Sequence, residues 1–461
     1  MPVSLPEHSA DDQLDRLRGF RRELHGCFTR WTDTLFETTD ALLCGPSRLE
    51  SLPHLTLQPE LRRGHGSVYA ALAKGRIDIA ALRRLLAGAV QPEFGLVFAA
   101  DVSNWHRPDA LTCPERTLNY DSGKDPGTGE RVNCTTPGWA FSWLAQIGPS
   151  RKSWVTPVDL DRVGPDDNAN RVAVHQIRRL LDHLAALRIG GVPIVCCDAG
   201  YSPAALGALS EDRVQVVVRL RADSVLVTAP PPMPPGTPGR PRRHGPQMKL
   251  KHPGTWPAPG QIQHVPAESG RAGLTVTCWH RLHLRPSRAY HEPEPDARPA
   301  KANRRLIHGS LIQIRSNNPR HKTIWLWWTG PDGTFDLDAL WRAYLRRFGI
   351  EHFFRFGKQH LAWTTPRLRT PAQAERWSWL VAAAYTQLLL ARHLTHTRLP
   401  PWERGHTTSP HRVKRGFRAL RAELGTPAQP RQNSTPGPGR PPGRPNQHKH
   451  PRYPKVKKPQ G

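Results

Sequence analysis

The residues best suited to chemistry lie in one stretch, Trp341–Trp363. Within it four reactive or charged side chains stand at offsets of 0, +3, +7 and +14: Tyr344, Arg347, Glu351 and Lys358. At about 100° per residue, these offsets fall within roughly 60° of one another around a helix axis. On a single helix, one carboxylate, two cations and a phenol would therefore point the same way. Taken alone, such a face also matches an ordinary surface row of salt bridges.

Two aspartates earlier in the chain end apolar runs that are typical of strands. Asp101 ends the run that starts at Phe94, and Asp198 follows the apolar residues from Val192. Carboxylate oxygens are the ligands that hard divalent cations prefer, so three carboxylates from two strands and a helix suit a pair of such ions. The predicted set is Asp101, Asp198 and Glu351. Three other carboxylates stand in turn-like contexts that favour solvated caps: Asp109, Asp159 and Asp161.

The charge balance narrows the class of partner. The 461-residue chain has 66 Lys and Arg against 38 Asp and Glu, a formal charge of +28. Such an excess favours a polyanion, either nucleic acid or an anionic membrane. No apolar run approaches the roughly 18 to 20 residues that span a bilayer, and we expect no signal peptide before residue 30. Nucleic acid is therefore the expected partner, and the protein is expected in the cytoplasm, associated with the nucleoid.

The seven cysteines carry little functional signal. They show no CxxC pair and no Cys/His zinc spacing, so no structural metal is expected. Cys196 and Cys197 lie in an apolar run and indicate small core residues. We expect a reducing compartment.

The elements that must position these residues follow from periodicity. Residues 10–45 predict two helices. Residues 65–90 predict two short helices joined at Lys74-Gly75-Arg76, a pattern compatible with a DNA-reading helix-turn-helix and equally with a plain helical hairpin. From residue 94 strands dominate, at 94–102, 139–147, 153–158, 192–198 and 214–220, with helices at 171–187 and after Pro203. This alternation predicts an α/β sheet covered by helices.

Residues 222–335 interrupt that unit and favour a β-rich insertion. Its strand candidates are Leu274–Leu284, Leu311–Arg315 and Lys322–Thr329. After it comes a long apolar helix, Pro371–Leu394, expected to pack on the sheet. Residues 426–461 hold ten prolines, eight Lys or Arg and no acidic residue. Such a segment buries too little apolar surface to offset its ordering entropy, which predicts a disordered basic tail.

The three motifs in this order resemble bacterial insertion-sequence transposases with a DDE catalytic core, of the subgroup with a YREK signature. That signature, Tyr-x2-Arg-x3-Glu-x6-Lys, is matched by the four residues of Trp341–Trp363. The subgroup's second motif, Asp-x-Gly-Phe/Tyr, is matched by Asp198-Ala199-Gly200-Tyr201. The resemblance covers roughly residues 94–395. It implies an RNase H-like fold: a mixed five-stranded sheet flanked by helices, with a β-rich insertion before the glutamate.

The expected organisation has five parts. They are a helical DNA-binding region at 1–92, the first part of the catalytic core at 93–221 and the insertion at 222–335, followed by the second part of the core with C-terminal helices at 336–425 and the tail at 426–461. Gly349 and Gly357 each weaken the signature helix by about 1 kcal/mol. We therefore expect that helix to bend near residue 349.

The resemblance also implies a chemistry. Asp101, Asp198 and Glu351 would hold two Mg²⁺ ions, with Mn²⁺ able to substitute, for in-line attack at phosphorus. Arg347 and Lys358 would clamp DNA phosphates near the scissile bond, and Tyr344 would support the same backbone.

In hairpin-forming relatives a tryptophan at the start of the matching insertion strand stacks on a flipped nucleotide, and Trp325 occupies the position that resembles it. Three tryptophans in four residues, Trp325 to Trp328, are nevertheless more typical of a sheet core than of a ligand platform.

The predicted function is therefore a transposase that binds terminal inverted repeats of double-stranded DNA, cleaves them and transfers the strands, as a homodimer when assembled on the DNA ends. An alternative is a catalytically inactive or domesticated DNA-binding protein derived from such an enzyme. A stand-alone nuclease shares the core chemistry but leaves the predicted helices of residues 10–90 and the insertion unexplained.

Overall fold

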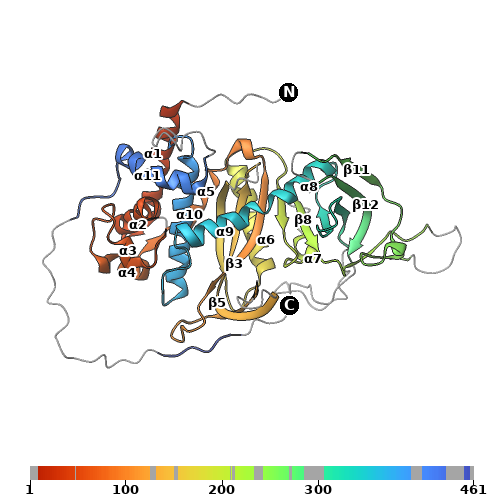
Figure 1. Ribbon diagram of the computed structural model, residues 1–461, viewed down its shortest axis with the longest axis horizontal. Coiled ribbons are helices and arrows are strands. Elements are labelled where there is room, and N and C mark those ends of the chain that lie inside the picture. The colour runs from red at the N-terminus through yellow and green to blue at the C-terminus, as the bar shows by residue number, and fades with distance from the viewer. Residues whose placement is uncertain are drawn as a thin grey trace. The chain divides into compact units, whose positions relative to one another are not determined.

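The structure is a computed structural model of the 461-residue chain (Figure 1). It describes residues 9–46, 48–124, 131–149, 154–207, 209, 213–232, 242–268, 272–284, 306–395, 408–431 and 451–456. Their contacts form two compact units. The first unit takes Met1–Glu93, Val102–Asp167 and Gly349–Pro459, and the second takes Phe94–Asp101 and Asn168–Phe348 with the last two residues.

The first unit opens with helices whose starts are fixed by polar side chains. They are α1 (Ala10–Cys27), α2 (Thr32–Cys44), α3 (Leu52–Leu55), α4 (His65–Lys74) and α5 (Ile79–Ala87). Ser9 and Asp12 form a reciprocal capping box at α1, and the Asp78 carboxylate accepts a hydrogen bond from the Ala81 N–H at α5. The predicted helices at 10–45 and 65–90 are confirmed. Between them lie two short strands that were not predicted, β1 (Phe28–Arg30) and β2 (Arg76–Ile77), which pair antiparallel.

Three antiparallel strands form the sheet of the first unit: β4 (Thr117–Lys124), β5 (Arg131–Ile147) and β6 (Val155–Val163). The first part of β3 (Val97–His106) belongs to the second unit, and its later residues run beside β5. The Arg107 N–H donates to the Pro137 carbonyl over 2.7 Å there. A Cβ on Gly138 would lie 2.3 Å from the Trp105 carbonyl oxygen, so only glycine permits this approach of the two strands.

Three later helices complete the first unit: α9 (Gly349–His360), α10 (Pro371–Leu390) and α11 (Pro410–Leu424). The apolar helix α10 packs on α2 and on β6, as predicted for the long helix near the C-terminus. Aromatic rings fill the core between α9 and the sheet. Trp143 of β5 lies 5.1 Å from Phe353 and 5.0 Å from Trp363, measured between ring centres, in edge-to-face arrangements.

A buried polar network joins the N-terminal and C-terminal helices of this unit. The Arg21 guanidinium lies 2.7 Å from the Asp40 carboxylate, and both side chains are almost fully buried. Arg21 also donates to the Gln387 side chain over 2.6 Å and to the Gly425 carbonyl over 3.1 Å. Arg421 makes a second ion pair with Asp40 at 3.3 Å. Four helices, α1, α2, α10 and α11, therefore share one set of buried charges.

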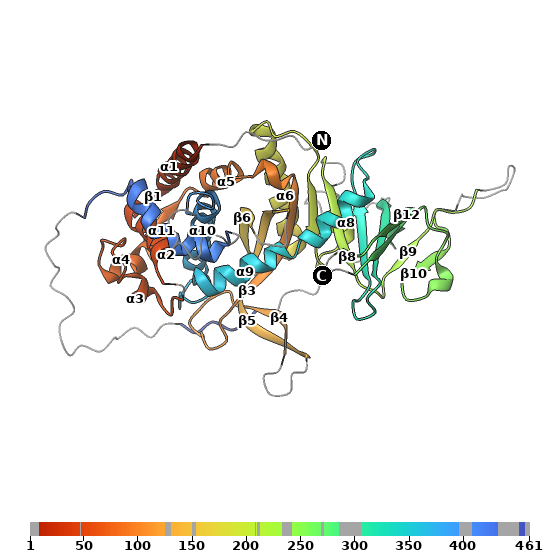
Figure 2. The same ribbon diagram turned by 45° about the horizontal axis from the view of Figure 1, so that its top comes forward.

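The second unit is built on a mixed sheet. Residues 97–100 of β3 run parallel to β7 (Ile194–Cys197), which runs parallel to β8 (Gln215–Leu220). Antiparallel strands extend the sheet in the order β14 (Ile324–Thr329), β13 (His308–Ser316), β12 (Leu274–Leu284), β9 (Val225–Val227) and β10 (Gln247–Lys249), with β11 (Gln261–Val265) also paired to β12. Figure 2 shows this run from β8 to β10.

Helices α6 (Ala169–Ala186), α7 (Pro203–Gly207) and α8 (Leu337–Arg346) accompany that sheet. The Asp336 side chain caps α8 by accepting a hydrogen bond from the Ala339 N–H. The buried face of α8, with Leu340, Trp341 and Tyr344, joins an apolar cluster with strand residues such as Cys196 and Ile312. The β-rich character of residues 222–335 is confirmed for the described residues.

Two sequence predictions about element boundaries are wrong. β3 does not end at Asp101 but continues to His106, because its later residues find a partner in β5. The stretch Trp341–Trp363 is not one helix: α8 ends at Arg346 and α9 begins at Gly349, so an interruption takes the place of the expected bend near residue 349. A Cβ on Gly349 would lie 3.2 Å from the Ile147 side chain, so a glycine here lets α9 start close against β5.

Most of the predicted disordered tail, residues 426–461, lies outside the described residues. Residues 426–431 and 451–456 are described. The Tyr453 N–H donates to the Leu111 carbonyl over 3.0 Å, and the Val456 N–H donates to the Arg116 carbonyl over 2.9 Å. The short segment 451–456 therefore lies along the chain that enters β4.

Candidate active site

The two predicted catalytic aspartates lie where the parallel pairing of β3 and β7 ends, in the second unit. In the parallel pair of β3 and β7, Ala100 lies opposite Cys197, and each aspartate is the next residue along its strand. Asp101 and Asp198 are therefore neighbours across the ladder. Both are partly buried.

The turn after Asp198 explains the small residue in the Asp-x-Gly motif. The Gly200 N–H donates to Asp198 Oδ1 over 2.8 Å, which holds the carboxylate over its own backbone. A Cβ on Gly200 would lie 3.1 Å from the same oxygen. Glycine therefore leaves room for the tight turn that orients the second aspartate.

An arginine neutralises the first aspartate. Arg347 Nη1 lies 2.9 Å from Asp101 Oδ2, with the side chains only 11% and 16% exposed. Arg347 is the C-cap residue of α8, and its N–H donates to the Tyr344 carbonyl over 3.0 Å. Charge-assisted hydrogen bonds of this kind are the stronger ones in proteins. The predicted phosphate clamp thus holds a carboxylate in this structure.

The ring of Tyr344 packs against that arginine. Its side chain is 5% exposed within the apolar cluster, and burial raises the pKa of its phenol to about 12. The Arg347 guanidinium lies 6.0 Å from the centre of the Tyr344 ring. The phenol is therefore neutral at physiological pH and packs against the cation.

The cysteines next to the aspartates are inert core residues, as predicted. Burial raises the pKa of Cys196 to about 12 and raises the pKa of Cys197 well above its ordinary value. All seven cysteines are free thiols. Neither of the two cysteines that flank the site is therefore a thiolate at neutral pH.

Glu351 and Lys358 belong to the first unit, in α9. Glu351 lies in the first turn and is partly buried. The pKa of its neighbour His352 is lowered by burial, with a smaller effect from Arg355. The Lys358 ammonium lies 5.7 Å from the Trp363 ring centre. Because α8 and α9 are separate helices, the prediction that four signature residues share one helix face is wrong.

The donor chemistry of the aspartates fits a hard divalent cation. Both offer only carboxylate oxygens, and the Arg347 guanidinium already stands in for a cation at Asp101. Glu351 lies in the other unit. Among the described residues, no group of three or more His, Cys, Asp and Glu side chains is arranged to hold a metal ion.

The remaining carboxylates are not all solvated caps. Asp109 is exposed in a turn, as predicted. Asp159 and Asp161 lie on β6 and pair with Arg83 at 2.8 and 2.6 Å, and Asp159 is 5% exposed. The alternation around Leu160, with apolar and acidic residues at successive positions, is the strand signal that sequence reasoning missed.

Trp325 is a core residue of the insertion. It is 4% exposed, and its ring centre lies 5.2 Å from that of Trp256 and 6.0 Å from that of Trp279. Its strand partner on β8 is Leu220. Stacking on a base requires an open ring face, so a nucleotide reaches Trp325 only if this aromatic cluster opens.

The family model of the DDE superfamily endonucleases matches residues 23–283, and the chain belongs to that family. The matched range contains Asp101 and Asp198 and stops before α8. DDE superfamily endonucleases generally use divalent metal ions. The predicted DDE family is thus confirmed.

A search of curated proteins found no match. Among solved structures, the chain is similar to a piggyBac transposase, in a cryo-EM structure of its synaptic complex with hairpin DNA. The identity is 12% and the TM-score 0.38, with 95% of this chain and 80% of that chain covered. No helix in the described part of the chain is long and apolar enough to cross a membrane.

Proposed function

We propose that the chain is the transposase of an insertion sequence, of the YREK subgroup. It binds the terminal inverted repeats of its element and catalyses strand cleavage and strand transfer. One observation carries the proposal: Asp101 and Asp198 are adjacent across the parallel β3–β7 pair, inside the range that matches the DDE family. Double-stranded DNA suits the formal charge of +28.

An RNase H-like core fits the strand pairing. In that fold the first and fourth strands of the core are neighbours, and here β3 and β7 pair in parallel. The later residues of β3 neighbour β5, which pairs antiparallel with β6. The β-rich residues 222–335 separate the second aspartate from Glu351, as an insertion in such a core would.

Each site residue has a defined task in this proposal. Asp101 and Asp198, with Glu351 as third carboxylate, would hold two Mg²⁺ ions, or Mn²⁺ in their place. When bound, such ions activate the attacking oxygen and stabilise the leaving one. Arg347 exchanges Asp101 for a DNA phosphate, Lys358 binds a second phosphate, and Tyr344 keeps Arg347 in position.

Four further parts of the proposal concern DNA binding, assembly and location. Trp325 is the candidate platform for a flipped nucleotide once its aromatic cluster opens. The protein acts as a homodimer on paired DNA ends and works at the nucleoid. The helix pair α4 and α5 contributes to DNA binding in the first unit.

The test compares cleavage and binding on one labelled terminal-repeat duplex in Mg²⁺ or Mn²⁺. Glu351→Gln keeps the shape of the side chain but removes a negative charge, so cleavage should fall by orders of magnitude while duplex affinity changes little. Asp109→Asn, at an exposed turn carboxylate, is the matched control and should cleave like the wild type. Unchanged cleavage by Glu351→Gln would remove the glutamate from the triad.

A second candidate function is a DNA-binding protein derived from such an enzyme and no longer catalytic. The ion pair between Arg347 and Asp101 favours it, because an arginine there blocks one metal ligand. The same assay separates the two: a wild type that binds the duplex without cleaving it in either metal supports the second candidate. Cleavage of duplexes without terminal repeats at equal rate would instead indicate a stand-alone nuclease.

A further inference from the structure

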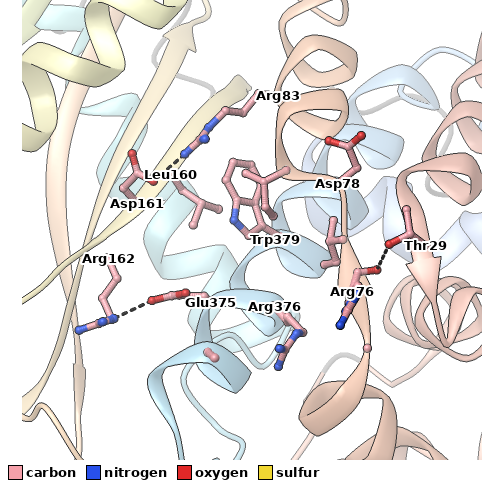
Figure 3. Close-up of a pocket in the computed structure, with 14 residues that line it drawn as sticks. Thr29, Arg76, Asp78, Arg83, Leu160, Asp161, Arg162, Glu375, Arg376 and Trp379 are labelled. Carbon is pink, nitrogen blue, oxygen red and sulfur yellow. Dashed lines mark hydrogen bonds and ion pairs between the residues drawn. The ribbon is translucent and has the colours of Figure 1, made fainter.

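A cavity of about 630 Å³ lies wholly within the first unit. Its walls come from β1 and β2, the start of α5, strand β6 and the start of α10 (Figure 3). Four arginines line it: Arg76, Arg83, Arg162 and Arg376. Three acidic residues line it as well: Asp78, Asp161 and Glu375. The question is which of these charges are already satisfied.

Two of the arginines are neutralised within the protein. Arg83 Nη2 lies 2.6 Å from Asp161, and Arg83 also pairs with Asp159 outside the lining. Arg162 Nε lies 2.7 Å from Glu375 (Figure 3). These two arginines therefore account for two of the three acidic residues of the cavity.

The third acidic residue has a local task. The Asp78 carboxylate accepts a hydrogen bond from the Ala81 N–H over 2.9 Å and caps α5. The carboxylates of the lining are thus committed to other groups. Arg76 and Arg376 remain.

Arg76 has an unused guanidinium. Within the described part of the chain this guanidinium has no hydrogen-bond or ion-pair partner. The backbone carbonyl of Arg76 accepts a hydrogen bond from the Thr29 hydroxyl. Its register partner across the β1–β2 pair is Arg30, another cation. Like charges opposite each other on paired strands are unfavourable, and a bound anion would relieve them.

Arg376 is half committed. Its Nη1 donates a hydrogen bond to the Leu72 carbonyl over 2.6 Å, near the end of α4. Among the described residues, its Nη2 and Nε donate no hydrogen bond. Burial lowers the pKa of Arg376, which indicates that its charge is short of solvent. Trp379 and Ile77 add apolar surface to the same cavity.

We propose that this cavity binds a phosphate group through Arg76 and Arg376. Guanidinium donors match phosphate oxygens in pairs, which is why arginine serves this task better than lysine. The phosphate we favour belongs to a DNA backbone. This choice of source rests on the proposed DNA function. A free phosphate ion offers the same chemistry.

The first experiment measures protection of individual arginines from phenylglyoxal in the full-length protein, by mass spectrometry. The two probes are a duplex DNA and inorganic phosphate alone. At ten times its dissociation constant, a bound probe should slow modification of Arg76 about tenfold. The exposed Arg22 on α1 is the control, and phosphate should leave its rate unchanged.

The outcomes separate the two sources. Protection of Arg76 by both probes, or by the duplex alone, supports a backbone phosphate. Protection by inorganic phosphate alone assigns the cavity to a free phosphate. Equal modification of Arg76 with and without either probe overturns the proposal.

The second experiment uses Arg76→Ala and the control Arg22→Ala. Because Arg76 is exposed, both variants should fold, which thermal melts check. Loss of one phosphate contact should reduce the slope of log affinity against log salt by about 0.9, an effect larger for Arg76→Ala than for Arg22→Ala. Equal slopes in the two variants remove the backbone source.

A wild-type protein that binds no duplex would refute the proposed function. The inorganic phosphate arm would then still test the cavity by itself.

Discussion

In the proposed site Arg347 and a metal ion would compete for the same Asp101 oxygen, and Arg347→Ala tests this directly. The guanidinium lies 2.9 Å from Asp101 Oδ2 with both side chains mostly buried, so solvent screens the pair little. A hydrogen bond between charged groups contributes about 1.5–3 kcal/mol. A metal that binds Asp101 must displace this contact. At 1.4 kcal/mol for each factor of ten, removal of Arg347 should tighten metal binding by about 10- to 100-fold.

The assay is titration of the protein without DNA by Mn²⁺, followed calorimetrically. The matched control is Arg342→Ala, on the same helix, which breaks an exposed ion pair with Asp338 at 2.7 Å. It should leave Mn²⁺ affinity unchanged. The double variant Arg347→Ala with Asp101→Asn should lose the gain, because the released oxygen is then no longer a carboxylate.

Equal or weaker Mn²⁺ binding by Arg347→Ala would refute this reasoning. In that case the ion pair would not compete with the metal. Duplex affinity should meanwhile fall in Arg347→Ala, since the same guanidinium is the proposed phosphate ligand. Opposite effects on metal and DNA are the signature that a merely structural arginine would not give.

Three further predictions test other parts of the chain. Gly200→Ala crowds Asp198, since the added Cβ would lie 3.1 Å from its Oδ1, and should weaken Mn²⁺ binding without lowering the melting temperature by more than a few degrees. Arg21→Met leaves a buried carboxylate short of a partner and should cost about 3–5 kcal/mol in urea unfolding, against about 0–1 kcal/mol for Arg18→Met, which breaks an exposed pair. Burial lowers the pKa of Lys414 to about 8 from 10.5, so the folded state binds fewer protons there. Between these values the wild type should gain unfolding free energy with rising pH relative to Lys414→Met, and parallel profiles would contradict the lowered pKa.

The sequence predicted the elements that depend on local pattern. The alternating apolar residues of Leu274–Leu284 gave β12 with its observed ends, and the periodicity of residues 171–187 gave α6 within two residues. The end of β7 just before Asp198 was recognisable because the apolar run stops there, whereas Asp101 lies inside β3. Gly349 indicated an irregularity in the signature helix, and α9 begins at that residue.

Long-range pairing was beyond the reach of such patterns. Nothing local indicates that Arg347 pairs with Asp101, since 246 positions separate them and only the packing of α8 brings them together. The same holds for Arg83, which turns Asp159 and Asp161 from expected surface caps into partners inside the unit. β4 was missed because its buried residues Thr117 and Asn119 are polar, so no apolar alternation marks the strand.

The shared charges of α1, α2, α10 and α11 have a consequence for synthesis on the ribosome. Arg21 and Asp40 emerge early, but two of their partners, Gln387 and Arg421, are made some hundreds of residues later. Until then α1 and α2 carry charged side chains that the complete fold buries. The first unit can therefore close only when the C-terminal helices have left the exit tunnel. A chain that stops before α10 would therefore lack the partners Gln387 and Arg421 for these buried charges.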